Sequence, residues 1–169
     1  GVGKTTTAKA VYNMILQHYE CSCFLENVRE VSEQLGGLAH LQEKLLSSIL
    51  MIEKLKVDSV DRGISLMRER LCSKRVLIVL DDLDKLSQVK SLVGGRDWFG
   101  SGSTIIITTR DEHLLDLIQV DNKYEAEKLN FTESLELFSW HAFRTNIPLE
   151  DYAGLSNSIV SYCGGLPFA

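Results

Sequence analysis

Two uninterrupted apolar runs constrain the fold of this chain more than any other feature. Residues 75–82 read RVLIVLDD and residues 103–110 read STIIITTR. Both runs are rich in β-branched residues and lack polar alternation, which is typical of parallel strands covered on both faces. Parallel strands need a long crossover between them, and this crossover is usually a helix. The runs therefore predict an α/β fold with a parallel sheet.

Helical patterns occupy the segments between these strands, as that fold requires. Apolar side chains recur at positions 8, 11, 12, 15, 16 and 19, which predicts a helix after Thr5. The stretch CSCFLENV predicts a strand over 21–28, and the glycines at 36 and 37 precede helices over 38–50 and 60–71. A short helix from Asp111 and a weak strand over 123–126 complete the expected alternation.

The pattern changes near residue 130, where two helices follow each other without a strand. Helical spacing covers residues 130–143, with Thr132 as the expected N-cap, and covers residues 151–163. Gly164, Gly165 and Pro167 are expected to end the second helix. We therefore expect an α/β domain over residues 1–129 and the start of a helical subdomain over residues 130–169.

Charge and composition exclude some classes of function. The net charge of −5 and the pI of 5.4 argue against a broad nucleic-acid surface. No apolar run approaches the roughly 20 residues that span a bilayer, so we expect no membrane segment. The cysteines are expected to be reduced core thiols, which favours the cytoplasm over an oxidising compartment; disulfides or a metal site are the less favoured alternatives. They are Cys21, Cys23, Cys72 and Cys163.

The opening residues GVGKTT resemble a phosphate-binding loop followed by a helix. Glycines suit such a loop because backbone N–H groups must approach the phosphates closely. Lys4 would reach the β- and γ-phosphates, and the Thr5 hydroxyl would hold Mg²⁺. The alternative is a helix start punctuated by glycines. The expected nucleotide-binding residues of this loop are Gly1, Val2, Gly3, Lys4, Thr5 and Thr6.

Two carboxylates end the first apolar strand. Asp81 is expected to bind Mg²⁺ or its waters, and Asp82 to orient or deprotonate an attacking water. The alternative is that the aspartates merely end a strand and begin a turn. Because a lysine loop and an acidic strand end rarely occur together by chance, their combination favours a nucleoside-triphosphate site.

Arg110 ends the second apolar strand, which should lie beside the acidic strand. Its guanidinium would suit a γ-phosphate, with Thr108 and Thr109 as further hydrogen-bonding groups. The alternative is an exposed arginine paired with Asp111 or Glu112. Near the end of the chain, Pro167 could pack on a flat base, although composition alone favours a simple helix stop.

Taken in order, GVGKTT, CSCFLENVRE, RVLIVLDDLD, GSGSTIIITTRDEHLL and CGGLPFA resemble the motifs of the nucleotide-binding (NB-ARC) domain of plant disease-resistance proteins. The resemblance covers the whole chain. Asp84, where the coiled-coil class usually has Trp, and FLENVRE resemble the class that begins with a Toll/interleukin-1-receptor (TIR) domain. Phe168 stands where the family usually has Leu. The fold implied is a P-loop NTPase parallel sheet that lacks its first strand.

The resemblance also implies roles. Residues 3–6 would hold the phosphates and Mg²⁺, and Asp81 would bind the metal. Arg110 would sense the γ-phosphate, and Pro167 would contact the adenine. Asp82 would act in hydrolysis. The parent would be a receptor with flanking TIR and leucine-rich-repeat domains, switched off by ADP and on by ATP, and prone to self-oligomerisation.

Two alternatives stay open. One is a turnover phosphotransferase that uses the same loop. The other is that this chain by itself binds no nucleotide, because loss of the first strand would leave two neighbouring strands with unpaired backbone groups.

Overall fold

The computed structural model describes residues 1–167 and divides the chain into two compact units. The larger unit comprises residues 7–123 and contains all three described strands. The smaller unit combines residues 1–6 with the chain from residue 124 onward. Each unit is described by itself below.

A parallel sheet forms the centre of the larger unit. Its strands are β1 (Cys21–Leu25), β2 (Val76–Leu83) and β3 (Thr104–Thr109), in the order β1-β2-β3. Cys23 lies opposite Ile78, and Leu80 lies opposite Ile107. The α/β class with a parallel sheet is confirmed.

The expectation of two strands left with unpaired backbone groups stays a prediction; within the described sheet, β1 and β3 are each paired on one side only. β2 pairs with β1 on one side and with β3 on the other. Two apolar parallel strands present complementary N–H and C=O rows, so they can hydrogen-bond directly to each other. The acidic strand is therefore the central strand of the described sheet.

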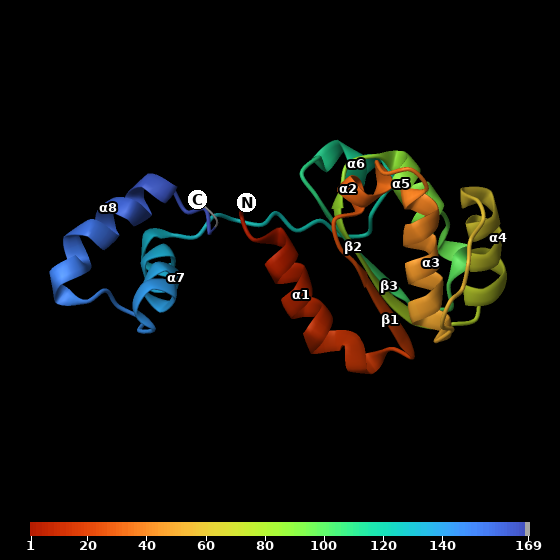
Figure 1. Cartoon of the computed structure of the whole chain (residues 1–169), viewed down its shortest axis with the longest axis horizontal. Coiled ribbons are helices and arrows are strands. Elements are labelled where there is room, and N and C mark those ends of the chain that lie inside the picture. The colour runs from red at the N-terminus through yellow and green to blue at the C-terminus, as the bar shows by residue number, and fades with distance from the viewer. Residues whose placement is uncertain (168–169) are drawn as a thin grey trace. The chain divides into compact units, whose positions relative to one another are not determined.

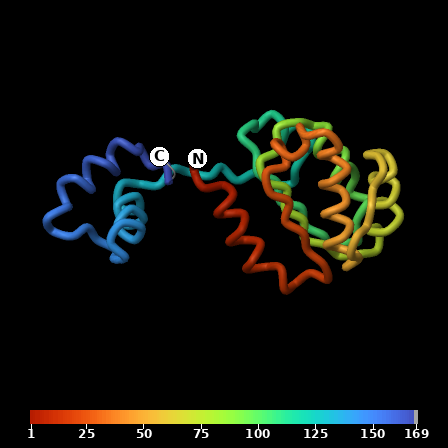
Figure 2. Tube along the Cα trace, viewed as in Figure 1, coloured from red at the N-terminus to blue at the C-terminus, as the bar shows by residue number. Residues whose placement is uncertain are grey.

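Helices connect and cover these strands (Figure 1). Helix α3 packs against β1 and contacts α4, and Figure 2 follows the trace from β1 through these helices back to β2. Two short helices, α2 and α5, were not expected from the sequence. The helices lying wholly in this unit are α2 (Val28–Ser32), α3 (Gly37–Leu50), α4 (Val60–Leu71), α5 (Leu86–Val93) and α6 (Glu112–Leu117), with single 3₁₀ turns η1 (Leu16–His18) and η2 (Arg96–Trp98).

The main core lies between one face of the sheet and these helices. Ile78 and Leu80 of β2 are fully buried there, as are Leu45 of α3 and Met67 of α4. Full burial of one such side chain contributes about 1.5–3 kcal/mol. This core fixes β2, and hence the acidic residues at its end.

The other face of the sheet is contacted by α1 (Lys4–Ile15). The Tyr12 hydroxyl donates to Ser22 Oγ at 2.7 Å, and the Tyr12 ring meets Phe24 edge-on at 5.5 Å. Ala8 is buried as expected, but Val11 is 37% exposed. The predicted apolar stripe of this helix is thus only partly covered.

Among its described residues, the smaller unit contains the start of α1 and the helices α7 (Phe131–Phe143) and α8 (Ala153–Cys163), with a 3₁₀ turn η3 (Glu150–Tyr152) before α8. The predicted N-cap at Thr132 is wrong. Asn130 caps α7 instead, because its side chain accepts from the Glu133 N–H while Glu133 accepts from the Asn130 N–H, both at 2.9 Å. Gly164 and Gly165, both with positive φ, follow α8 as expected.

The weak strand predicted over 123–126 is wrong, since these residues join no ladder. Tyr124 is 81% exposed, so its β-forming side chain has no sheet surface to cover. Across residues 1–167, no helix combines the length and apolar character needed to span a bilayer.

The four cysteines are thiols, in three different environments. Cys23 is buried in the core, and this burial raises the pKa of its thiol. Cys21 and Cys163 are partly exposed. The prediction of core thiols therefore holds for Cys23 and is wrong for Cys72, which is exposed at the end of α4.

Candidate functional site

The carboxyl end of β2 carries the acidic pair. Asp81 is buried, and its Oδ1 accepts a hydrogen bond of 2.7 Å from the Thr108 hydroxyl on β3. The same hydroxyl oxygen accepts the backbone N–H of Asp82 at 2.9 Å. The register shifts between Leu80 and Leu83, and Asp82 adopts φ +58°. A non-glycine residue with positive φ is uncommon and often marks a functional site.

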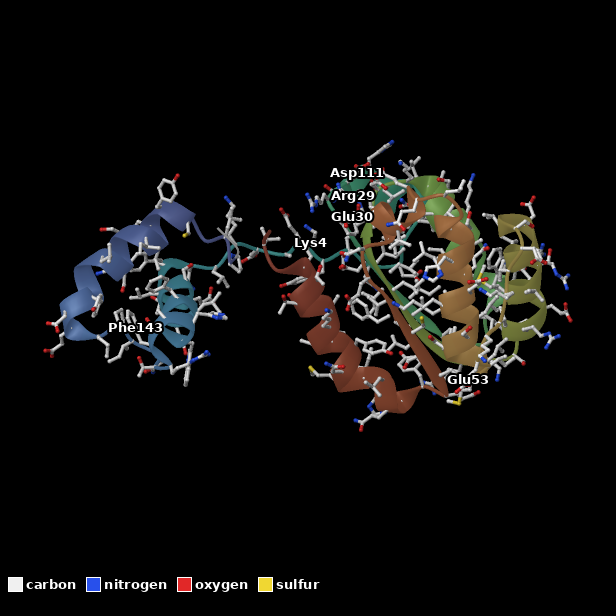
Figure 3. All side chains as sticks on the ribbon, viewed as in Figure 1. Lys4, Arg29, Glu30, Glu53, Asp111 and Phe143 are labelled. Carbon is white, nitrogen blue, oxygen red and sulfur yellow. The ribbon has the colours of Figure 1, made fainter. Side chains whose placement is uncertain are left out.

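Two arginines converge on the Asp82 carboxylate from different elements. Arg29, on α2, places Nε 3.0 Å and Nη2 2.9 Å from Oδ2. Arg110, after β3, places Nε 3.3 Å from Oδ1. Figure 3 labels Arg29 at this end of the larger unit, together with Asp111, the neighbour of Arg110. The structure thus brings Asp81, Asp82 and Arg110 to one edge of the sheet.

Arg110 has a different partner from the adjacent acids of the alternative given above. Its ion pair is with Asp82 rather than with an adjacent acid, while Asp111 caps α6 by accepting the His113 N–H at 3.0 Å. The Arg110 side chain is 71% exposed. A mostly exposed guanidinium held by one contact of 3.3 Å can turn toward an anion at little cost.

The two threonines of β3 bond within the sheet. Thr108 bridges both aspartates as described, and the Thr109 hydroxyl donates to the Leu83 carbonyl at 2.7 Å. These bonds hold the ends of β2 and β3 together. Both hydroxyls therefore position the acidic edge.

The glycine loop belongs to the smaller unit. α1 begins at Lys4, so the loop leads directly into a helix N-terminus, as an anion-binding loop requires. Gly3 has φ +94°, a conformation that favours glycine. A Cβ on Gly3 would lie 3.9 Å from Pro167 Cγ, so this unit brings the loop and Pro167 together. Phe168 lies outside the described residues.

Arg29 was not expected at the site from the sequence. The segment that contains it, FLENVRE, was used in the sequence analysis only to indicate the TIR class of the family. A signal was available, because Arg29 follows β1, and ligand groups gather beyond the carboxyl ends of parallel strands. The helical turn that points its side chain toward Asp82 is too short to be seen in apolar spacing.

The metal prediction rests on donor chemistry. Among residues 1–167, no three or more His, Cys, Asp or Glu side chains form a cluster that could hold a metal. Mg²⁺ bound with a nucleotide usually takes only one or two carboxylates, and phosphates and water supply its other ligands. An aspartate at a strand end is therefore a donor that fits this ion.

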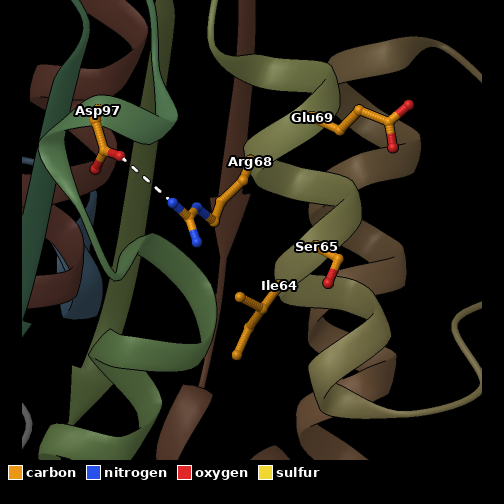
Figure 4. Close-up of a pocket in the computed structure, with 5 residues that line it drawn as sticks. All are labelled: Ile64, Ser65, Arg68, Glu69 and Asp97. Carbon is orange, nitrogen blue, oxygen red and sulfur yellow. Dashed lines mark ion pairs between the residues drawn. The ribbon is translucent and has the colours of Figure 1, made fainter.

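A separate surface pocket of about 470 Å³ lies elsewhere on the larger unit (Figure 4). Arg68 crosses it toward Asp97 of η2, with 3.9 Å between Nη2 and Oδ2. The remaining lining residues come from α4; they are Ile64, Ser65 and Glu69. The pocket contains none of the predicted site residues.

A parallel α/β sheet with a buried aspartate at the end of its central strand, next to an arginine on the neighbouring strand, places the chain in the class of nucleotide-binding α/β domains. The family model of the NB-ARC domain matches residues 1–147. The chain belongs to this family.

Curated relatives agree with this assignment. The chain is 49% identical to Disease resistance protein RPV1 of Vitis rotundifolia over 170 aligned residues, and 43% identical to TMV resistance protein N of Nicotiana glutinosa over 176. It is also 41% identical to Disease resistance-like protein DSC1 of Arabidopsis thaliana over 169 residues. All of the chain is covered in each case, but it spans only 12%, 15% and 14% of these relatives.

Proposed function

We propose that the chain is the ATP/ADP-binding switch module of a plant immune receptor that acts inside the cell. Membership of the NB-ARC family supports nucleotide binding, and relatives named disease resistance proteins support a role in defence. The observation that carries the proposal is the ion pair between Asp82 and the exposed Arg110, beside the buried Asp81. A removable cation beside fixed carboxylates is the arrangement that a γ-phosphate sensor needs.

In this proposal, residues 1–6 bind the phosphates through backbone N–H groups at the start of α1. Lys4 neutralises the β- and γ-phosphates, and Pro167 packs on the adenine. Thr5 and Asp81 would hold Mg²⁺, which supplies charge neutralisation when it is bound. Asp82 orients or deprotonates the attacking water.

The switch depends on Arg110. With ADP bound, no γ-phosphate competes with Asp82 for the guanidinium, and the protein stays off. With ATP bound, Arg110 contacts the γ-phosphate and the on state gains free energy. A shift from 1% to 99% of the on state needs about 5.5 kcal/mol of differential binding. Slow hydrolysis of ATP returns the protein to the off state.

The receptor context is part of the same proposal. Because the chain matches only a small share of each relative, we propose that TIR and leucine-rich-repeat domains flank this module in a longer protein that self-oligomerises when ATP is bound. Asp84 and the FLENVRE stretch support the TIR class. The alternatives are a turnover phosphotransferase and a chain that binds no nucleotide by itself.

Calorimetric titration of the longer receptor with ADP and with ATP tests the proposal. Lys4→Ala should weaken both nucleotides at least 10-fold, while Lys90→Ala, an exposed lysine on α5, should leave both affinities unchanged. Arg110→Ala should weaken ATP more than ADP. Light scattering should show assembly with ATP only.

Equal affinity for both nucleotides with no change of assembly would contradict the switch. Rapid phosphoryl transfer to a small acceptor would favour the phosphotransferase. Binding by the longer protein but not by the 169-residue chain would show that the chain needs its flanking residues.

A further inference from the structure

The two arginines contact the Asp82 carboxylate at different distances and through different oxygens. Arg29 donates from Nε to one oxygen, Oδ2, at 3.0 Å, and its Nη2 lies 2.9 Å from the same oxygen. Arg110 approaches only the other oxygen, Oδ1, at 3.3 Å. The Arg29 side chain is 34% exposed and the Arg110 side chain 71%. One arginine therefore holds the carboxylate with a charged hydrogen bond and a second close ion contact, and the other has one longer, solvated contact.

The backbone of Arg29 is anchored as well as its side chain. The Ser32 hydroxyl donates to the Arg29 carbonyl at 2.9 Å, and Gln88 Nε2 on α5 donates to Ser32 Oγ at 2.9 Å. Gln88 is buried and also donates to Asp84 Oδ1 at 2.7 Å. The five-residue helix that carries Arg29 is thus tied to the loop after β2, which limits how far the guanidinium can move.

Asp82 is fixed from the opposite side. Its φ of +58° is maintained by the hydrogen bond from its N–H to Thr108 Oγ1, and Thr108 in turn donates to the buried Asp81. Strained backbone of this kind persists only where the surroundings determine it. The orientation of the carboxylate is therefore set jointly by β3 below it and Arg29 beside it.

We propose that Arg29 is a positioning residue for ATP hydrolysis: it keeps Oδ2 of Asp82 occupied, so that Oδ1 alone faces the attacking water once Arg110 has turned to the γ-phosphate. This inference rests on the function proposed above. In the step served, the water oxygen bonds to the γ-phosphorus and the bond from phosphorus to the β–γ bridging oxygen breaks. ADP leaves, and the water proton passes through Oδ1 to the released phosphate.

Replacement of the two arginines should change different quantities, ATP affinity for Arg110 and kcat for Arg29. Loss of Arg110 should weaken ATP binding, because Arg110 contacts the nucleotide. Loss of Arg29 should lower kcat and leave nucleotide affinity unchanged, because the contact that its side chain makes is with Asp82. Misplacement of a catalytic group by about 1 Å can cost about 100-fold in rate.

Single-turnover hydrolysis and calorimetry on the longer receptor test this split. Arg29→Gln should lower kcat about 10- to 100-fold, while the dissociation constants for ATP and ADP change less than about twofold. Arg29→Lys keeps a positive charge that can donate to Asp82, so it should hydrolyse ATP at an intermediate rate. This variant replaces Arg29→Gln in the test if Arg29→Gln does not fold. The matched control is Arg68→Gln, an exposed arginine of α4, which should hydrolyse ATP at the wild-type rate.

The double variant Arg29→Gln/Asp82→Asn distinguishes positioning from a general structural effect. If Arg29 acts only through Asp82, the double variant should hydrolyse ATP no more slowly than Asp82→Asn alone. A wild-type kcat in Arg29→Gln, a further loss in the double variant, or equal losses of kcat and ATP affinity would each overturn the proposal.

A spectroscopic measurement separates this inference from the proposed function. In the 169-residue chain, the Arg29 Nε–H resonance should exchange slowly with water, the Arg110 resonance rapidly, and Asp82→Asn should abolish the difference. Fast exchange of the Arg29 resonance would overturn the anchoring. A slow Arg29 resonance in a receptor that binds no nucleotide would instead refute the proposed function.

Discussion

Replacement of Gly63 by alanine should destabilise the larger unit, although glycine-to-alanine changes within helices usually stabilise. Gly63 lies in α4 and faces Gln42, a fully buried side chain of α3. A Cβ at this position would overlap Oε1 and Cδ of Gln42 and lie 2.9 Å from Nε2. The Gln42 amide cannot swing into solvent, so it must leave its place.

The magnitude follows from the bonds that this amide makes. Gln42 Nε2 donates to the carbonyls of Val60 at 3.0 Å and Ser91 at 2.9 Å, which ties α3 to α4 and α5. Each lost bond costs about 1 kcal/mol net, and a buried polar group left unpaired costs about 1–3 kcal/mol. The better helix propensity of alanine offsets about 1 kcal/mol. We expect a net loss of about 2–4 kcal/mol in the free energy of unfolding.

Urea unfolding followed by circular dichroism measures this loss. The control is Gly154→Ala in α8, where a Cβ would meet no atom within 4 Å and stability should not fall. In a Gln42→Ala background, Gly63→Ala should lose most of its penalty, since the overlapping amide is absent. A Gly63→Ala protein as stable as the wild type would refute the reasoning.

Three further predictions concern thiol access, pH and the end of α8. A maleimide should label exposed Cys72 at once and buried Cys23 only on unfolding, as mass spectrometry of timed samples would show; equal rates would contradict this. The hydrogen bond from Lys9 lowers the pKa of Glu26, so Glu26→Gln should lower the free energy of unfolding by about 0.2–1 kcal/mol at pH 7. This difference should vanish as the pH falls through the pKa of Glu26, and a pH-independent difference in urea unfolding would disagree. Gly165→Ala should lower the melting temperature of the smaller unit, because φ there is +79° and a Cβ would overlap a linker carbonyl; an unchanged temperature would count against it.

The sheet could be predicted because its signals are local. β2 and β3 are continuous apolar runs, and parallel strands bring their carboxyl ends to one edge, which places Arg110 near Asp82. The strand expected at 123–126 had no such run. Its single aromatic residue, Tyr124, gave β propensity without a partner strand, and tertiary structure decided the outcome.

Arg29 and the short helices could not be predicted, for a related reason. α2 has five residues and α5 eight, too few for a helical period to stand out from chance. The contact between Arg29 and Asp82 joins residues 53 positions apart, and nothing in their local spacing records it. Likewise, the cap of α7 was assigned two residues late, because Thr132 and Asn130 are both good N-cap residues and only the reciprocal bond with Glu133 distinguishes them.

The bonds of Gln88 explain why Asp84 should not be exchanged alone. Gln88 Nε2 donates hydrogen bonds to Asp84 and Ser32, while its Oε1 accepts hydrogen bonds from the backbone N–H groups of Asp84 and Lys85. An indole at position 84 offers no acceptor, so Gln88 Nε2 would keep only its bond to Ser32. The side chains at 32, 84 and 88 therefore form one hydrogen-bonded unit, and a change at one of them alters the partners of the other two.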